Sequence, residues 1–439
     1  MNQLSVTKTL ALAVLILLPF WALPILPGTF RPISMFLTLP LGLMYLLTAI
    51  REDKLEKTEV LLLMFFLTAL FFSCVQFAFL GGGASTFIIG NFLLALGIFG
   101  YFGFRFCLRE FGLTKVLGYV KAAIYIIVAV GWFDVLGWLG IIPDALRGMV
   151  NYAIAGKSSS RIVLTVSEPA WASRLALCFL PFAYYFWSVE RTLLNKFALG
   201  SLFIFFLLCF SLSGIVVLLS AIGLYLISQI SIKVIFKTFI LIVVLCTSLF
   251  FVFEKMKEEG GYFVSRFDKI ASIESVDSLM TLEALAAIDG SALIRIGYPW
   301  IALQVAFDEP LGIGVGRYPE YFNEKITQYG KIVTNDIAVA EHIAKKSADQ
   351  RSYFIKVYSE TGLLSLFLVC FYVSIHRKLK VLKQKFEGKH VHLYKLCIAL
   401  LLSMFVCYGN MIQFASFIFP FYWFAPAMVN YLYLNEEKS

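Results

Sequence analysis

The stretch "EVLLLMFFLTALFFSCVQFAFL", residues 59–80, indicates the fold class because it is too long and too apolar for a typical water-soluble domain. Glu59, at its first position, is the only charged residue in it. A membrane-spanning helix needs about 20 consecutive, mostly apolar residues. This stretch meets that requirement, so it predicts a helix that crosses a bilayer.

The composition of the whole chain extends this interpretation. Hydrophobic residues make up 60% of the 439 residues, 44 of them are Phe, and the mean hydropathy is +0.83, whereas soluble domains are about half apolar. We therefore expect an all-α polytopic membrane protein with about twelve transmembrane helices. The first apolar run has no small-residue cleavage site, so we expect a retained helix rather than a removed signal peptide. The predicted spans are 8–26, 33–50, 59–80, 87–106, 116–142, 171–189, 196–210, 213–230, 234–253, 353–375, 394–410 and 414–434.

The distribution of Lys and Arg predicts the orientation. Alternate connections carry these residues, most of all "HRKLKVLKQKFEGKH" (376–390), while opposite connections such as "GGGAS" (81–85) carry almost none. Positively charged loops remain in the cytoplasm, so both termini are predicted to be cytoplasmic. Orientation then explains most of the net charge of +9, and we do not interpret that charge as nucleic-acid binding.

Two connections on the predicted outer side are longer than turns, and they divide the chain into three parts. These are helices 1–9 with a short periplasmic segment at 143–170 (residues 1–253), a large helical periplasmic loop before the tenth helix (254–352), and helices 10–12 (353–439). Within the loop we expect helices at 276–290, 291–310 and 335–350. The glycine-rich "PLGIGVGR" (310–317) lacks the ending of a phosphate loop and follows no strand, so it predicts a flexible turn.

Arginines gather in the outer connections and are candidates for ligand binding. Arg161 and Arg174 begin and end "RIVLTVSEPAWASR", while Arg295, Arg317 and Arg351 belong to the large loop. A guanidinium donates parallel hydrogen bonds and keeps its charge, which suits phosphate, and charges near a bilayer are functional candidates. An anionic ligand is one interpretation. Solvated loop charges or contacts with lipid headgroups are the other.

Glu168 precedes Pro169 at a predicted helix start. The helix dipole alone favours an acid there; alternatively, its carboxylate accepts a proton or orients a hydroxyl beside Arg161. His342 has no acid or nucleophile with it, so we predict a surface residue. The eight cysteines lie in or at the ends of predicted spans without metal-ligand spacing, so we expect neither a structural disulfide nor a metal site.

Three stretches in this order resemble the superfamily of O-antigen ligases and Wzy-type O-antigen polymerases. They are "RIVLTVSEPAWASRLAL", "YPWIALQVAFDEPLGIGVGRYPEYF" and "RSYFIKVYSETGLLSLFLV", and the likeness covers about residues 160–375. Ligases commonly have His-Asn nine residues before the Glu of the last stretch, where this chain has Arg351 and Ser352. Arg351 with Gly362 is instead similar to the Arg-x10-Gly motif of the polymerases. Arg161 starts no second such motif, because Ala172 stands eleven positions later.

The resemblance implies a GT-C-type glycosyltransferase in the bacterial inner membrane. Such a polymerase moves a growing chain from undecaprenyl pyrophosphate to a sugar hydroxyl of an incoming lipid-linked repeat unit. The scheme needs no cofactor or metal, and a chain-length regulator is a further expected partner. For this chain we expect catalytic roles for Glu168, Arg161 and Arg351. Expected substrate-binding residues are Arg174, Arg295, Arg317, Trp171 and Tyr298.

Two alternatives remain open. An O-antigen ligase would transfer finished polymer from undecaprenyl pyrophosphate to a lipid A core. A flippase for lipid-linked oligosaccharides would need charges spread through both halves of the chain, whereas the charges here gather in outer connections.

Overall fold

The computed structural model describes residues 3–25, 30–156, 159, 161–209, 211–229, 282 and 293–437. Every element in these ranges is helical, and they contain no β-strand. The predicted span 234–253 and all of the predicted helix 276–290 except residue 282 lie outside the described residues.

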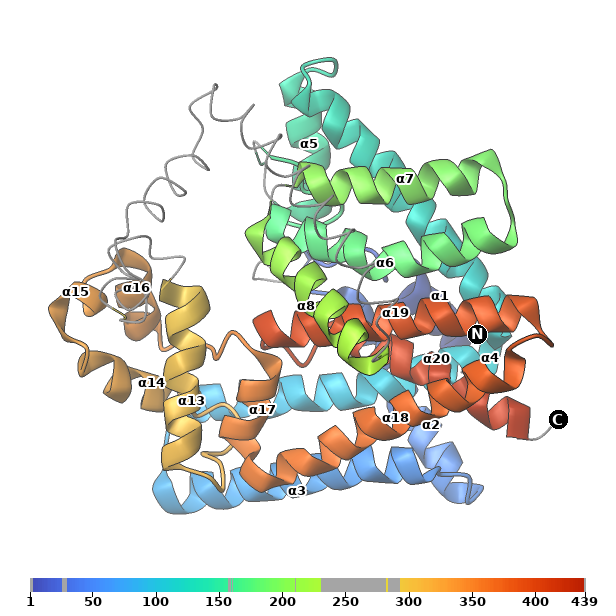
Figure 1. Cartoon of the computed structure of the whole chain (residues 1–439). Helices are drawn as coiled ribbons and strands as arrows, with labels where there is room; N and C mark the ends of the chain where they lie inside the picture. Colours follow the sequence, from blue (N-terminus) through green and yellow to red (C-terminus); the bar gives the residue numbers. More distant parts are fainter. Residues whose placement is uncertain are drawn as a thin grey trace.

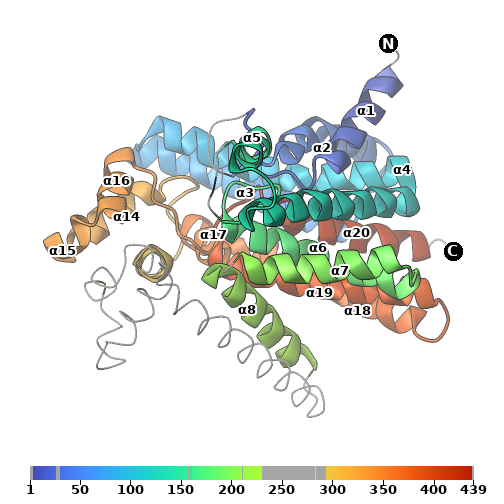
Figure 2. The same cartoon turned by 90° about the horizontal axis from the view of Figure 1, so that it is seen from above.

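Most long helices run roughly side by side, and both termini lie at the same end of this bundle (Figures 1 and 2). We call that end the terminal end, and the opposite one the subdomain end. In chain order the helices of the bundle are α1 (Gln3–Ile16), α2 (Ile33–Arg51), α3 (Lys57–Leu80), α4 (Ala84–Trp138), α5 (Asp144–Ala155), α6 (Pro169–Val189), α7 (Leu193–Leu208), α8 (Leu212–Gln229), α17 (Tyr353–Thr361), η3 (Gly362–Leu364), α18 (Ser365–Phe386), α19 (Val391–Gln413) and α20 (Pro420–Glu437).

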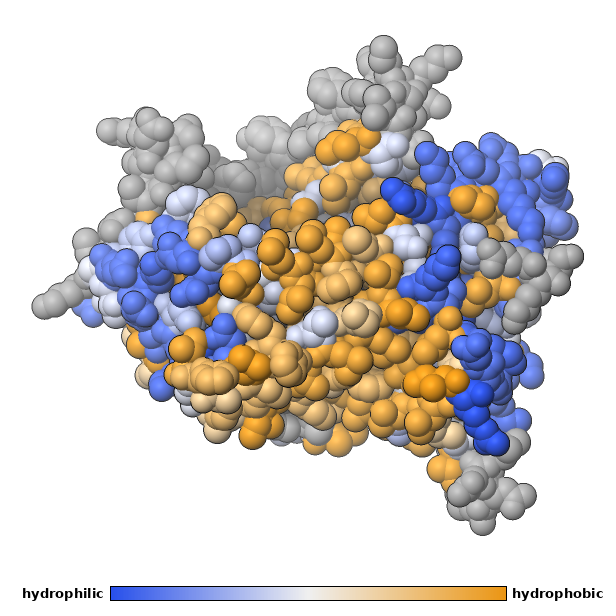
Figure 3. All heavy atoms as spheres, turned by 90° about the horizontal axis from the view of Figure 1, so that it is seen from below, coloured by the Kyte–Doolittle hydropathy of each residue, from blue (hydrophilic) through white to orange (hydrophobic). Residues whose placement is uncertain are grey.

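Within the described residues, five helical runs are long and apolar enough to cross a membrane: α2, α3, α4, the run of α17 through α18, and α19. They confirm that the chain is a helical membrane protein. Two predicted spans form the single long α4, which is interrupted at Gly112 (φ 72°). Figure 3 shows a broad apolar face between hydrophilic ends, which is the surface that a bilayer requires.

Among the predicted spans whose boundaries differ from the structure, two differ at a proline. The helix predicted over 8–26 ends at Ile16, because Pro19 has no N–H group to continue the hydrogen-bond ladder. The span predicted over 414–434 begins only at Pro420, and proline is favoured in the first turn of a helix.

The final helix, α20, lies at the centre of the bundle rather than at its edge. Its residues 421–425 and 427–429 are all fully buried. The bundle also closes tightly between α2 and α4, where a Cβ atom at Gly42 would lie 2.3 Å from the carbonyl oxygen of Phe99. Small residues permit this approach in membranes, where packing rather than hydrophobic burial holds helices together.

A small subdomain packs against one end of the bundle (Figure 1). It consists of the π-helical turn η2 (Leu293–Gly297), α13 (Tyr298–Asp308), α14 (Tyr318–Thr327), α15 (Gly330–Thr334) and α16 (Ile337–Lys345). Its own apolar core includes Leu293, Tyr298, Ile301 and Phe322. The helices predicted over 291–310 and 335–350 correspond to α13 and α16, with shorter bounds.

Candidate functional site

Asp134 fixes the segment that leads into α6. Its fully buried carboxylate, near the end of α4, accepts hydrogen bonds from the backbone N–H groups of Val163 (2.7 Å) and Leu164 (3.3 Å). Arg147 of α5 donates from Nε to the same carboxylate (2.8 Å) and from Nη2 to the carbonyl of Arg161 (3.1 Å). Leu164 has φ 55°, which is unusual for leucine. These contacts hold the segment in one conformation.

Glu168 follows this fixed segment as the N-cap residue of α6. It is half-buried, and Pro169 begins the helix after it. The side chain of Glu168 makes no capping hydrogen bond to the α6 backbone. A side-chain capping role therefore lacks its usual contact, although the helix dipole still favours the charge, as considered from the sequence.

Arg174 carries a buried positive charge in the second turn of α6. Its Nη2 donates to Ser213 Oγ of α8 (2.9 Å) and to the carbonyl of Gln413 at the end of α19 (3.5 Å). Its guanidinium lies 4.8 Å from the centre of the Trp171 ring and 5.3 Å from that of Phe414. Its Nε is buried without a hydrogen-bond partner, and no described carboxylate lies within ion-pair distance.

Two further arginines lie near Arg174, as the sequence led us to expect. Arg295 of η2 and Arg351, two residues before α17, are close enough for their charges to act on it. Arg351 forms an ion pair with Asp349 (Nε to Oδ1, 2.8 Å). We call Arg174, Arg295 and Arg351 the arginine cluster; it lies where the small subdomain meets the bundle.

The backbone of Arg351 is strained, with φ 53° in the region that favours glycine. A non-glycine residue remains in that region only where its surroundings enforce it, and such strain gathers at functional sites. Arg295 lies on a π-helical turn, which is another local irregularity common at functional sites.

The ring of Trp171 packs against neighbouring side chains and is not a free stacking surface. Its ring stacks on Phe30 at 4.6 Å and meets the edge of Phe414 at 4.3 Å. The guanidinium of Arg174 lies against the same ring. Little of the Trp171 ring is therefore accessible for the expected stacking on a sugar.

Two of the predicted site arginines occupy other environments. The side chain of Arg161 is exposed, and its fixed part is the backbone carbonyl that Arg147 binds. Arg317 is buried 3.5 Å from Glu320 and lies against Tyr321. Glu320 in turn accepts a hydrogen bond from the backbone N–H of Gly83, between α3 and α4. Arg317 therefore takes part in the attachment of α14 to the bundle.

The turn at 310–317 is a packed clamp, so the prediction of a flexible turn was wrong. The N–H of Val315 donates to Ser73 Oγ of α3 (2.9 Å), and the N–H of Gly314 donates to the carbonyl of Glu360 (2.9 Å). A Cβ atom at Gly316 would lie 2.3 Å from the carbonyl oxygen of Thr86. Glycine is needed here for close approach between backbones, not for mobility.

Tyr298 is fully buried in the core of the small subdomain, where it cannot offer its ring to a substrate. Its hydroxyl shares a hydrogen bond of 2.8 Å with Nδ1 of His342, a half-buried residue of α16. His342 is thus part of the packing and not the plain surface residue that we predicted. Burial raises the pKa of Tyr298. Burial and then the charge of Arg351 lower the pKa of His342.

Sequence reasoning missed a buried ion pair beside the cluster. Lys356 Nζ lies 2.7 Å from Glu360 Oε1, which also accepts a hydrogen bond from Gln350 (3.1 Å). Glu360 is fully buried, and its backbone carbonyl supports the clamp. The i,i+4 spacing of lysine and glutamate on one helix was a signal that could have revealed the pair.

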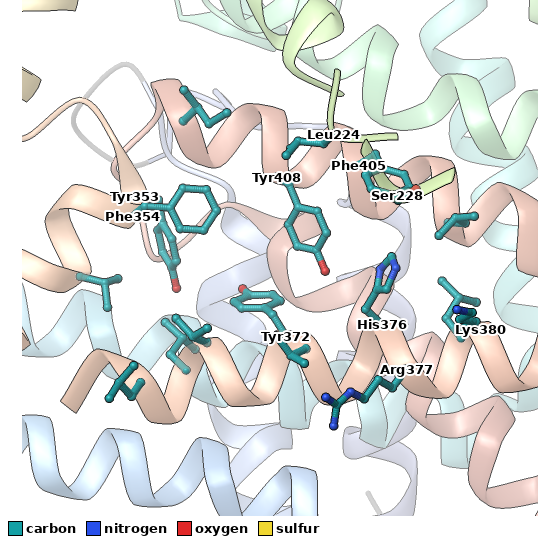
Figure 4. A pocket seen from close by; sticks show the side chains of 18 of the residues that line it. Leu224, Ser228, Tyr353, Phe354, Tyr372, His376, Arg377, Lys380, Phe405 and Tyr408 are labelled. Carbon is teal, nitrogen blue, oxygen red and sulfur yellow. The ribbon is translucent and has the colours of Figure 1, made fainter. Parts of the chain in front are cut away.

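A lateral cleft with a volume of about 1180 Å³ opens between α8, α17, α18 and α19. Figure 4 shows Tyr353, Phe354, Tyr372 and Tyr408 along it, with His376 further along α18. Its lining is mainly apolar and begins two residues after Arg351. Pockets for drug-sized ligands have roughly 300–1,000 Å³, so this cleft has room for a longer, lipid-like molecule.

These features define a class: a helical membrane protein with a cleft of lipid size and a group of three arginines, of which Arg174 is buried. Arg174 binds the carbonyl of Gln413, which follows the cleft residue Ile412. Among the residues that the structure describes, no three His, Cys, Asp or Glu side chains are grouped to hold a metal ion. No protein-family model matches the sequence, and no curated protein matches it.

Proposed function

We propose that this protein is a GT-C-type glycosyltransferase with about twelve transmembrane helices. It polymerises oligosaccharide repeat units linked to undecaprenyl pyrophosphate at the periplasmic face of a bacterial inner membrane. Both termini are cytoplasmic in this proposal, and a chain-length regulator is a further partner. The resemblance of residues 160–375 to the polymerases suggests the reaction, and the arginine cluster supplies the physical argument.

The observation that carries the proposal is the buried charge of Arg174, which has no acidic partner among the described residues. A buried ion normally requires a partner of opposite charge, because the interior solvates it poorly. Arg174 has aromatic rings and two neutral acceptors, with two more arginines nearby. Such a site favours a ligand that brings several negative charges, and a diphosphate does so.

The lateral cleft supports a lipid attached to that diphosphate. Its apolar wall starts at Tyr353 and Phe354, next to Arg351. A polyprenyl chain can lie along this wall while its diphosphate contacts the arginine cluster. The transferred sugar would then lie on the side of the small subdomain, near the fixed segment and Glu168.

The chemistry follows from this arrangement. The hydroxyl oxygen of the incoming repeat unit attacks the anomeric carbon of the growing chain, and the bond from that carbon to the diphosphate oxygen breaks. Glu168 accepts the hydroxyl proton, and undecaprenyl pyrophosphate leaves with the bonding electrons. Fixed guanidinium groups stabilise the charge that develops on the leaving group without waiting for water to reorganise.

The test is to supply the purified protein, in lipid nanodiscs, with a repeat unit linked to undecaprenyl pyrophosphate. We expect a ladder of longer products on a gel, lost in Arg174→Gln and Arg351→Ala but present in Arg191→Gln, which changes an exposed arginine elsewhere. A normal ladder in Arg174→Gln would remove the cluster from the mechanism. If Glu168→Gln kept the full rate of sugar transfer, the only remaining role of Glu168 would be that of an acid at the start of α6.

The same assay separates the alternatives. A ligase leaves the repeat unit at its original length until a lipid A core is added as acceptor. A flippase moves the molecule but forms no glycosidic bond. Arg351-Ser352, standing where ligases have His-Asn, favours the polymerase.

A further inference from the structure

The lateral cleft has a polar end, opposite the end at which Tyr353 and Phe354 lie. On α18 its lining runs from Leu366 to Lys383. At 1.5 Å per residue this part of the cleft is roughly 26 Å long, close to the thickness of a bilayer core. The two ends therefore face opposite leaflets.

Cations without acidic partners gather at this second end. Arg377, Lys380 and Lys383 all line the cleft, and one carboxylate, Glu387, lines it beside them. In the described part of the chain none of the three cations forms an ion pair. By contrast, Lys378, on another face of the same helix, is paired with Glu56. On α18, the cations without an ion pair to a described residue are thus the ones that line the cleft.

His376 adds a hydrogen-bonding group between the cations and the apolar wall. Its Nδ1 is buried and has no hydrogen-bond partner among the described residues. Its ring faces Phe405 at 5.7 Å, and Figure 4 shows it beside Tyr372 and Tyr408 in the cleft. The order along the cleft is cations, one neutral polar group, then aliphatic and aromatic side chains. A glycerophospholipid has the same order of phosphate, ester and acyl chain.

We propose that this end of the cleft binds an anionic glycerophospholipid from the leaflet on the side of the termini. Arg377, Lys380 and Lys383 bind the headgroup phosphate, and the acyl chains lie along Tyr372, Val373 and Tyr408. Basic pockets between transmembrane helices are known to hold anionic lipid headgroups. The occupant is a phospholipid and not the polyprenyl substrate, because the proposed function places the substrate's diphosphate at the opposite end, and this choice of occupant rests on that function. This inference goes beyond the proposed transferase activity.

Native mass spectrometry of the full-length protein tests the proposal, with added phosphatidylglycerol compared with phosphatidylcholine. The wild type should retain phosphatidylglycerol preferentially. Replacing Arg377, Lys380 and Lys383 by Gln should weaken that binding at least about tenfold, since each cation near an anionic lipid contributes severalfold. A matched variant with Arg51, Arg191 and Lys196 changed to Gln loses the same charge from exposed positions outside the cleft and should bind as the wild type does.

A second variant separates the cleft from simple surface attraction. Val373→Trp should fill the apolar part while leaving every cation in place, and it should also reduce retention of phosphatidylglycerol. A photoreactive phosphatidylglycerol should label α18 or α19 between residues 372 and 408. Equal retention of both lipids by the wild type, unchanged retention in the triple cleft variant, or labelling confined to other helices would overturn the proposal. Sugar transfer enters none of these readouts, so they are independent of the proposed enzyme function.

Discussion

Two buried arginines at opposite ends of the bundle have different kinds of partner. At the terminal end, Arg105 of α4 donates to Glu59 of α3 (3.0 Å) and to the hydroxyl of Tyr45 of α2 (3.1 Å). At the subdomain end, Arg174 contacts two neutral oxygens and two rings, with more arginines nearby. The first charge is neutralised by the protein and joins three helices. The second has no acidic partner among the described residues, and for this reason the proposed function assigns it to ligand binding.

The largest effect should come from breaking the neutralised pair. Glu59→Gln leaves Arg105 buried without its counter-charge, so we expect a loss of about 3–5 kcal/mol in the free energy of unfolding. Thermal melting of the purified protein measures it. Per folded molecule, polymer formation should remain unchanged, and a selective loss of activity would contradict the structural role.

Asp134→Asn tests whether the fixed segment is structural support for the site. The amide retains one oxygen acceptor but leaves Arg147 without its counter-ion, so we expect about 2–3 kcal/mol of destabilisation and slower sugar transfer. Asp144→Asn, at the start of α5, is the control because Asp144 is exposed there. If transfer slowed with an unchanged melting temperature in Asp134→Asn, the residue would act on the reaction more directly.

Arg174→Gln should give the opposite pattern from Glu59→Gln. Loss of one preorganised cation should slow sugar transfer roughly a hundredfold, while the melting temperature stays equal or rises because a buried unpaired charge is gone. Arg174→Lys should recover only part of the rate, since lysine lacks the planar fork. A lowered melting temperature together with normal transfer would show that Arg174 is a structural residue.

Arg351→Gly separates backbone strain from side-chain charge. Glycine adopts φ 53° without strain, so relief of strain should raise the free energy of unfolding by about 1 kcal/mol. The greater conformational entropy of glycine in the unfolded chain opposes this gain. Transfer should fall with the lost cation. Arg351→Ala keeps the strain and loses the same cation, so a difference in stability between the two variants measures the backbone contribution.

The smallest effect concerns His342 in the small subdomain. Its pKa is lowered in the folded protein, so the unfolded chain binds more protons. Stability from this residue is therefore present above its ordinary pKa of about 6.5 and is lost as the pH falls below it. The melting temperature of the wild type should fall between pH 7 and pH 5, and His342→Gln should reduce that fall. An identical pH dependence in both proteins would exclude His342 as its source.

Local patterns in the sequence predicted the helices well, because the length of an apolar run depends only on neighbouring residues. Residues 33–50 and 59–80 are such runs, and the structure shows helices there. Arg174 and Arg351 were both predicted as site residues, and the structure places them near each other. The contact between Asp134 and Val163 was not predicted, because it joins residues far apart in the chain and one of them lies inside an apolar run.

Tyr298 shows the other limit of sequence reasoning. Its motif suggested a contact with substrate. However, the helices that pack against α13 determine which of its faces is buried, and Tyr298 lies on the buried face. The clamp at 310–317 is similar. Its glycines suggested a flexible backbone, but contacts with Ser73 and Thr86 leave little space around them.

The central position of α20 has a consequence for biosynthesis. This helix follows every other described helix of the bundle in the sequence, yet those earlier helices pack against its Phe421, Trp423 and Phe424. Earlier helices can insert as they emerge, but until α20 has been made they surround a gap that its side chains fill. A nascent chain that stops before Pro420 is thus left with an open interior, which would expose to quality-control proteases the side chains that α20 otherwise covers.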